Sequence, residues 1–157
     1  MSDIPAVATA APSPWWFAKI STMIALLGWT VFEVLTEPAG IAWSWPAQVA
    51  IIAGAGLHLW HYLVLKKTVP NLAAADRLCV IGGLYRWVRH PMYLGDLLVV
   101  MGLTLVGSGP FSWLLGGAAA TAIVGLTWSE DHTLARRFPQ VHTGWRQSSW
   151  YLLPPLW

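Results

Sequence analysis

Two arginines, a histidine and several aromatic residues occur close together in the stretch Tyr85–Tyr93. Arg86 and Arg89 carry permanent positive charge, and His90 precedes Pro91, a residue that favours the first turn of a helix. A helix that begins at Pro91 has free backbone N–H groups at its start. Together with the two arginines, these groups favour an anionic ligand such as a carboxylate or a phosphate.

The aromatic side chains of the same stretch extend this chemistry. Tyr85, Trp87 and Tyr93 offer ring faces that could stack on a base or hold a cation such as a sulfonium. A basic, aromatic belt at a membrane surface has the same composition. The stretch alone therefore leaves a ligand site and an interface belt as equal alternatives.

A second polar group, Glu130 and Asp131, lies further along the chain. Helical spacing places Glu130, Leu134 and Phe138 on one side with Asp131 adjacent, so the paired acids would lie beside an apolar face. Acids in such a position can bind ribose hydroxyl groups or an ammonium group. The solvated start of a helix is the alternative for this pair taken alone.

Composition sets the class of protein in which these residues must be positioned. Of 157 residues, 56% are hydrophobic, only 10% are charged and 12 are tryptophan, which leaves too little polar surface to cover a water-soluble domain. We therefore predict an integral membrane protein. The net charge of +2 is too small to indicate nucleic acid as a partner, and the single Cys79 excludes an internal disulfide.

Four apolar stretches are long enough, or nearly so, for the roughly 20 helical residues that cross a bilayer. Lys19 and Glu33 lie near the ends of the first stretch, where long side chains are expected to extend toward the lipid headgroups. Gly107–Pro110 predicts a tight turn that makes an antiparallel hairpin of the last two stretches. The predicted spans are residues 15–35, 43–65, 91–107 and 110–128 of one domain that comprises residues 1–157.

The basic residues predict the orientation of these spans. They gather between the second and third spans and after the fourth, while residues 36–42 and 107–112 contain none. By the positive-inside rule, both basic segments and the N-terminus are cytoplasmic, so the C-terminal segment 129–157 lies on that side as well. Residues 1–14 are Ala/Pro-rich without the basic region of a signal peptide and are interpreted as a short flexible tail.

Several polar or small residues within the spans have competing interpretations. His58 and His61 lie one turn apart and could ligate a metal or haem, although interfacial histidines are more common. Asp96 is costly inside a span, which indicates either a functional role or, as an equal alternative, pairing with Arg86 or Arg89. The run Gly54–Gly56 has no preceding strand, so it is interpreted as a helix-packing patch and not as a nucleotide loop.

The two polar groups together resemble the isoprenylcysteine carboxyl methyltransferases and the related phospholipid and small-molecule methyltransferases of membranes. Gly83–Gly95 matches the family pattern G-x-Y-R-x-x-R-H-P-x-Y-x-G at every specified position. The second pattern, E-E-x-x-L-x-x-x-F-G-x-x-Y-x-x-Y, keeps its frame but differs at several positions, which hold Asp131, Pro139, His142 and Trp145. Members with prenylcysteine substrates have an arginine at the position of Thr127, and the family has an arginine at the position of Tyr151.

The resemblance implies a cytoplasmic site for S-adenosylmethionine between the loop before the third span and the C-terminal segment. The fold it implies is all-α, with four transmembrane helices and a cofactor pocket at the cytoplasmic face. Carried over by position, the residues that would line or flank the cofactor are Tyr85, Arg89, His90, Pro91, Met92, Tyr93, Glu130 and Asp131. The same transfer leaves the cofactor-contacting stretch 77–80 in doubt, because its usual first histidine is Arg77 here.

The implied function is methyl transfer to a small or lipophilic acceptor, with membrane lipid around it and no nucleic acid. A carboxylate or thiol acceptor is the first expectation and a phospholipid amine the second. No residue is assigned as general base, because His90 is as well explained by hydrogen bonding to its loop. A haem-binding electron-transfer subunit and a non-catalytic homologue are the alternatives of other classes.

Overall fold

The computed structural model describes residues 13–36, 45–68, 83–107 and 109–152, and all regular structure in this part of the chain is helical. The elements in chain order are α1 (Pro14–Thr36), α2 (Trp45–Thr68), the 3₁₀ helix η3 (Gly83–Arg86), α3 (Pro91–Gly107), α4 (Pro110–Arg137) and α5 (Pro139–Ser148). Four of these helices begin at a proline, whose fixed φ suits a first helical position and whose missing N–H costs nothing there.

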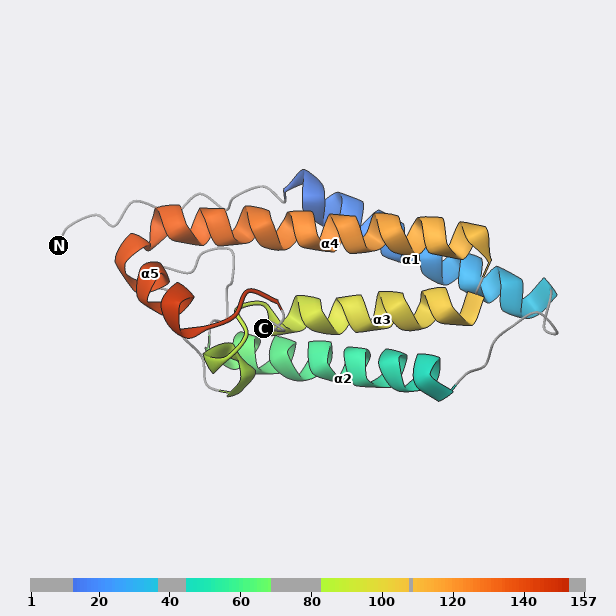
Figure 1. Ribbon diagram of the computed structural model, residues 1–157, viewed down its shortest axis with the longest axis horizontal. Helices are drawn as coiled ribbons and strands as arrows, with labels where there is room; N and C mark the ends of the chain where they lie inside the picture. Colours follow the sequence, from blue (N-terminus) through green and yellow to red (C-terminus); the bar gives the residue numbers. More distant parts are fainter. Residues whose placement is uncertain (1–12, 37–44, 69–82, 108, 153–157) are drawn as a thin grey trace.

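The four long helices form a bundle in which α3 lies between α4 and α2 (Figure 1). The most extensive contacts join α2 to α3 and α1 to α4. A core cluster of buried apolar side chains connects α1, α3 and α4, and its members are Leu26, Val100, Ala119 and Ile123. The short helix α5 folds back at one end of the bundle, beside η3.

Glycines allow α2 and α3 to cross with their backbones in contact. A Cβ atom added at Gly54 would lie 2.8 Å from the backbone nitrogen of Val99, and one at Gly95 would lie 2.8 Å from that of His58. A Cβ at Gly56 would meet nothing within 4 Å. The predicted packing patch is therefore right for Gly54 and wrong for Gly56, because only Gly54 faces α3.

Three helices, α1, α2 and α4, are long and apolar enough to cross a membrane. The fourth expected span, α3, has 17 residues and is shorter than the other three. At 1.5 Å per residue it extends only about 25 Å, somewhat less than a hydrocarbon core of about 30 Å. It contacts α1, α2 and α4, so part of its surface faces protein instead of lipid.

Helix α4 is longer than the span predicted within it. It continues without a break past Trp128 to Arg137, where Phe138 leaves helical geometry and Pro139 begins α5. Glu130 and Asp131 therefore extend rigidly from a membrane helix.

Two expectations about charged residues in the spans are wrong. Lys19 does not extend to the headgroups: it is buried at 8% exposure, and its Nζ lies 2.5 Å from Oδ2 of Asp96. Asp96 pairs with Lys19 and with Nδ1 of His58 at 2.7 Å, and not with Arg86 or Arg89. The physical reason is burial, because a carboxylate within the bundle is best neutralised by bases at the same depth on the facing helices α1 and α2. Glu33 accepts a hydrogen bond from Ser112 instead of standing free.

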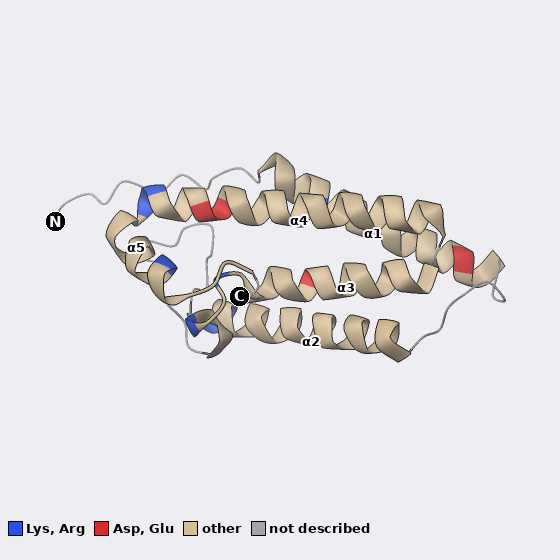
Figure 2. Ribbon diagram, in the orientation of Figure 1, with Lys and Arg blue, Asp and Glu red and all other residues tan. Residues whose placement is uncertain are grey.

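Most charged side chains of the described chain gather at one end of the bundle, near the ends of α2 and α4, η3 and α5 (Figure 2). Arg77 and the predicted loop 36–42 lie largely outside the described residues.

Candidate functional site

The loop before α3 is fixed by the C-terminal segment. The Arg89 N–H donates to the Trp150 carbonyl at 2.8 Å, and the Trp150 N–H donates to the Trp87 carbonyl at 2.7 Å. These bonds form an isolated parallel bridge between Val88 and Trp150. A segment that follows α5 thus fixes the backbone of the loop at Trp87 and Arg89, just before His90 and Pro91.

Helix α5 provides a second attachment to the same loop. The indole N–H of Trp145 donates to the Tyr85 carbonyl at 3.1 Å, and the two side chains form a buried cluster with Val64, Leu65 and Leu134. The cluster joins η3, α2, α4 and α5. Burial also raises the pKa of the Tyr85 hydroxyl to about 12, with a smaller contribution from Glu130.

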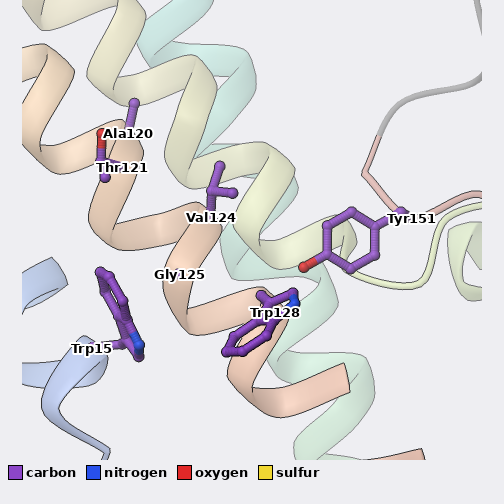
Figure 3. Close-up of a pocket in the computed structure, with 7 residues that line it drawn as sticks. All are labelled: Trp15, Ala120, Thr121, Val124, Gly125, Trp128 and Tyr151. Atoms are coloured by element: carbon purple, nitrogen blue, oxygen red, sulfur yellow. The ribbon is translucent and has the colours of Figure 1, made fainter. Parts of the chain in front are cut away.

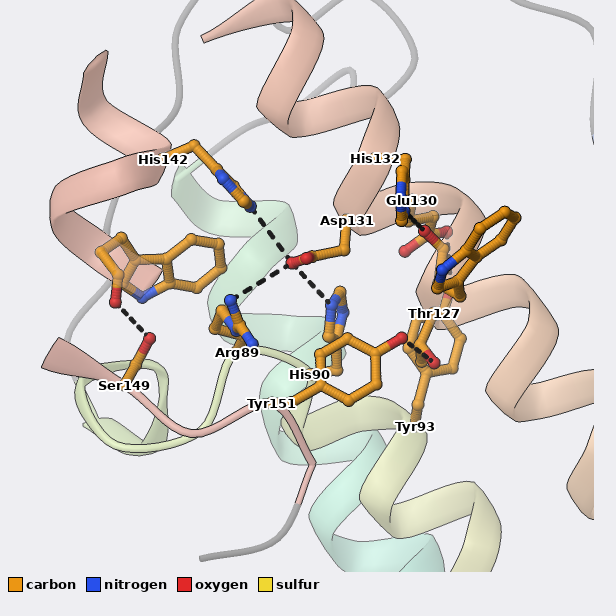
Figure 4. A network of polar contacts seen from close by, with 12 residues as sticks. Arg89, His90, Tyr93, Thr127, Glu130, Asp131, His132, His142, Ser149 and Tyr151 are labelled. Atoms are coloured by element: carbon orange, nitrogen blue, oxygen red, sulfur yellow. Dashed lines mark hydrogen bonds and ion pairs between the residues drawn. The ribbon is translucent and has the colours of Figure 1, made fainter. Parts of the chain in front are cut away.

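Three basic side chains converge on the carboxylate of Asp131 (Figure 4). Oδ1 of Asp131 lies 3.1 Å from Nε2 of His142, 3.7 Å from Nη1 of Arg89 and 3.7 Å from Nε2 of His90. All four residues are buried, at 9% exposure or less. They come from α4, α5 and the loop before α3, so this cluster, the Asp131 centre, exists only when those three elements are packed together.

Two members of the Asp131 centre, Arg89 and His90, can form further hydrogen bonds. Nε and Nη1 of Arg89 and Nε2 of His90 are buried without a hydrogen-bond partner among the described residues. The 3.7 Å distances from Nη1 of Arg89 and from Nε2 of His90 to Asp131 are too long for hydrogen bonds. Burial lowers the pKa of the Arg89 guanidinium, and the Asp131 carboxylate acts in the opposite direction. Unsatisfied buried donors are costly, so a ligand with acceptor oxygens would be stabilised here.

Glu130 takes part in a separate interaction. Its Oε1 accepts a hydrogen bond from the Tyr93 hydroxyl at 2.6 Å, which links α4 to α3. Nζ of Lys19 lies 4.7 Å from the centre of the same tyrosine ring. The two adjacent acids thus have different partners: Asp131 faces the loop and α5, and Glu130 faces the bundle.

Tyr151 lies over the Asp131 centre and connects it to α4. Its hydroxyl donates to Oγ1 of Thr127 at 2.9 Å, and its ring meets the His90 ring edge-on at 5.3 Å. The Arg89 guanidinium lies 5.2 Å from the centre of the Tyr151 ring. Thr127 itself is fully buried, and its hydroxyl donates to the Val124 carbonyl.

On the other side of Tyr151 an open cavity of about 600 Å³ lies between α1 and α4 (Figure 3). Its lining includes Trp15 of α1, Val124, Gly125 and Trp128 of α4, and Tyr151. None of the described side chains that line this cavity is charged. We call it the lateral groove, because it opens on the side of two helices that are long enough to span a membrane.

The structure brings most of the sequence-predicted site residues to one end of the bundle. Arg89, His90 and Asp131 are buried members of the Asp131 centre, Tyr85 is buried against Trp145 of α5, and Tyr93 and Glu130 bind each other. Pro91 is buried as the first residue of α3, and Met92 is half-buried. His58 pairs with Asp96 within the bundle, whereas the buried ring of His61 meets the Tyr85 ring edge-on at 5.5 Å and its Nδ1 lies 3.0 Å from the Leu57 carbonyl oxygen.

Sequence reasoning missed four residues as members of this site: His142, Trp145, Thr127 and Tyr151. It recorded them only as departures from a pattern. A signal for two of them was present, because His142 and Trp145 are spaced by three residues on an otherwise polar helix and hence share one face. Thr127 and Tyr151 gave no such signal, since their hydrogen bond crosses between separate segments.

A family model described as phospholipid methyltransferase matches residues 42–141 of the chain. The chain belongs to that family. No curated protein and no solved structure matches it significantly. The match to the phospholipid methyltransferase family includes α2, α3, α4 and the loop with Arg89 and His90, whereas His142 and Tyr151 lie beyond its end. Family membership implies methyltransferase activity in a membrane, and the apolar helices agree with it.

Proposed function

We propose that the protein is an integral membrane methyltransferase that uses S-adenosylmethionine and methylates a lipophilic or small acceptor. The observation that carries the cofactor assignment is the set of buried side-chain nitrogens on Arg89 and His90 that have no hydrogen-bond partner among the described residues. An amino-acid carboxylate or a ribose hydroxyl can accept hydrogen bonds from them. The family match supports the same assignment.

The other residues around the centre fit the remaining groups of this cofactor. Asp131 and Glu130 offer carboxylates to an ammonium group or ribose hydroxyls, and the rings of Tyr85, Tyr93 and Tyr151 offer faces to a positively charged sulfonium. Pro91 begins α3 with free N–H groups directed toward the loop. We assign Met92 to the same wall by its place beside Pro91.

The cofactor supplies a methyl group that is already activated by its sulfonium. The protein therefore has to bind and orient the two reactants and exclude water. In this proposal Arg89, His90 and Asp131 hold the cofactor, the bridge at Trp150 fixes the loop, and the surrounding apolar cluster of Tyr85 and Trp145 keeps water away. No residue needs to act as a strong base for a carboxylate or a thiolate acceptor, whereas an amine would lose a proton.

We propose four membrane spans, with α3 as the inner one, in a single domain whose termini lie in the cytoplasm. The concentration of basic side chains at the end of the bundle that holds the Asp131 centre supports this orientation (Figure 2). The acceptor then reaches the site laterally from the lipid. A phospholipid amine is the second candidate acceptor, and the description of the matched family favours it.

Calorimetric binding tests this function with the detergent-purified full chain. We expect saturable binding of S-adenosylmethionine and of S-adenosylhomocysteine, and none of ATP or NADPH. A protein that is folded by its thermal transition but binds neither sulfur compound would overturn the proposed cofactor.

A charge-removing variant tests the assigned site. Asp131→Asn keeps the shape of the side chain but removes the negative charge beside the Arg89 guanidinium, so we expect S-adenosylmethionine to bind at least about tenfold more weakly. His132→Asn is the matched control, because His132 is the next residue of α4 and is exposed. Equal affinity of Asp131→Asn and the control would show that the cofactor binds elsewhere.

A further inference from the structure

Tyr151 is the residue that the lateral groove and the Asp131 centre share. One side of its ring contacts His90 and Arg89, and the same side chain lines the groove together with Trp15 and Trp128. A molecule that moves from the groove toward the Asp131 centre by this route must displace the Tyr151 side chain. Figure 3 shows Tyr151 with the residues that line the groove, and Figure 4 shows it with the residues of the Asp131 centre.

The backbone of this segment is fixed, and the side chain is held by one directed bond. The neighbouring Trp150 is bound to the loop by two backbone hydrogen bonds, so the backbone at Trp150 cannot move away from the loop while they persist. The Tyr151 hydroxyl is held by Thr127 alone among the hydrogen bonds of the described residues. Because Tyr151 is only half-buried, rotation of its side chain is the small movement that would open the route.

The hydroxyl pair is electrically neutral. The Thr127 hydroxyl uses its proton on the Val124 carbonyl and accepts the proton of Tyr151, so both groups are satisfied without an ion. Burial raises the pKa of the Tyr151 hydroxyl, which keeps it protonated at neutral pH. None of the described residues that line the groove is charged, so the groove offers a carboxylate no cationic partner.

We propose that the Tyr151–Thr127 pair is the closure between the lateral groove and the Asp131 centre, and that the groove admits an alkyl chain ending in an uncharged nucleophile and disfavours a carboxylate. This inference rests on the proposed function and narrows its acceptor class. For a thiol, a sulfur lone pair forms the bond to the methyl carbon while the methyl–sulfonium bond breaks. S-adenosylhomocysteine leaves, and the thiol proton passes to water.

The test compares two acceptors with the same tail, dodecanethiol and dodecanoate, in nanodiscs that contain the full chain and S-adenosylmethionine. Methyl transfer is followed with labelled cofactor, and the Kd of the cofactor is measured separately by calorimetry. We expect kcat/KM for dodecanethiol to exceed that for dodecanoate by at least about tenfold. Cofactor binding without transfer to dodecanethiol, or equal use of dodecanoate, would overturn the inference while leaving the proposed cofactor intact.

Two substitutions of unchanged size test the closure itself. Tyr151→Phe and Thr127→Val each remove the hydrogen bond, so opening becomes easier and the KM for dodecanethiol should fall about two- to tenfold, the value of one hydrogen bond. The double variant should match the single ones, because both remove the same bond. Thr133→Val is the control, since this exposed threonine of α4 only bonds its own helix at Ser129.

The readouts separate a closure from a simple structural attachment. If the pair only attaches the C-terminal segment to α4, both variants would lower the thermal transition and weaken cofactor binding while the acceptor KM stayed constant. Additive effects of the two substitutions would also contradict the proposal. Tyr151→Phe alone is sufficient if Thr127→Val does not fold. Loss of cofactor binding by the wild-type protein would instead reject the proposed function.

Discussion

At the scale of single residues, burial decides which groups of the site can change their charge. Tyr85 is 8% exposed and lies in the cluster that joins the loop to α5. An ionised phenolate there would lose its hydration, and the negative Glu130 adds to the cost, so its pKa rises from 10.0 to about 12. The hydroxyl of Tyr85 therefore stays neutral throughout the physiological range.

This pKa shift predicts a dependence of stability on alkaline pH. A raised pKa means that the contribution of Tyr85 to stability is complete below pH 10 and is lost as the pH rises toward 12. At pH 11 the unfolded chain ionises this hydroxyl and the folded one largely does not. We expect wild type to lose about 1.4 kcal/mol relative to Tyr85→Phe between pH 9 and pH 11.

The measurement is denaturant unfolding in detergent for both proteins at the two pH values. Comparing the two removes the contributions of the other titrating groups, which they share. A difference that stays constant with pH would show that Tyr85 is not buried as a neutral group.

Sequence patterns predicted Arg89, His90 and Asp131 as site residues. They missed His142, which α5 brings to the same centre. Arg89, His90 and Asp131 are polar residues at positions set by a proline or by helical spacing, and each of these signals lies within one segment. Asp131 and His142 each depart from the family pattern, as do Thr127 and Tyr151. In the structure these departures contact each other in pairs, at 3.1 Å and 2.9 Å. Pairing across segments requires three-dimensional information.

At the scale of elements, the contact between α2 and α3 depends on which face of α2 lacks side chains. Gly54 faces α3 with its backbone against Gly95, while Gly56 faces open space. The sequence predicted both helices and a packing patch, since their composition and the run of small residues are local. It could not choose between the two glycines, because a weakly amphipathic helix does not indicate its rotation about its own axis.

This difference predicts opposite outcomes for two alanine substitutions in one helix. Gly54→Ala should destabilise the protein by about 1–3 kcal/mol, because the added methyl group forces two backbones apart. Gly56→Ala should change the stability by no more than about 0.5 kcal/mol. Thermal unfolding of the purified proteins in the same detergent measures both. Similar losses for the two variants would mean that α2 packs with another face.

At the scale of the whole molecule, one buried cluster of charges joins three helices. Asp96 of α3 binds Lys19 of α1 on one side and His58 of α2 on the other. The sequence suggested a partner for Asp96 among the nearby arginines of its own loop. In the structure Asp96 instead pairs with residues at the same depth in the bundle. A buried carboxylate is stabilised by bases in close contact with it, whether or not they are near it in the sequence.

Removing only one charge of this cluster should lower the free energy of unfolding much more than removing both charges. Asp96→Leu leaves the Lys19 ammonium group buried without its carboxylate, and we expect a loss of about 3–5 kcal/mol in the free energy of unfolding. Adding Lys19→Met should restore most of that loss, since an apolar pair of similar volume replaces the ions. Reversible unfolding of the single and double variants measures the coupling free energy between Asp96 and Lys19. A double variant that is less stable than Asp96→Leu would rule out this account.

The bridge between Val88 and Trp150 has a consequence for biosynthesis. The ribosome makes the loop of Arg89 and His90, then the whole hairpin of α3 and α4, before it makes the segment that pairs with that loop. A nascent chain can therefore insert every apolar helix while the Asp131 centre is still open. Membrane integration and completion of the site are separate events in time, and the second must wait until Trp150 has left the exit tunnel.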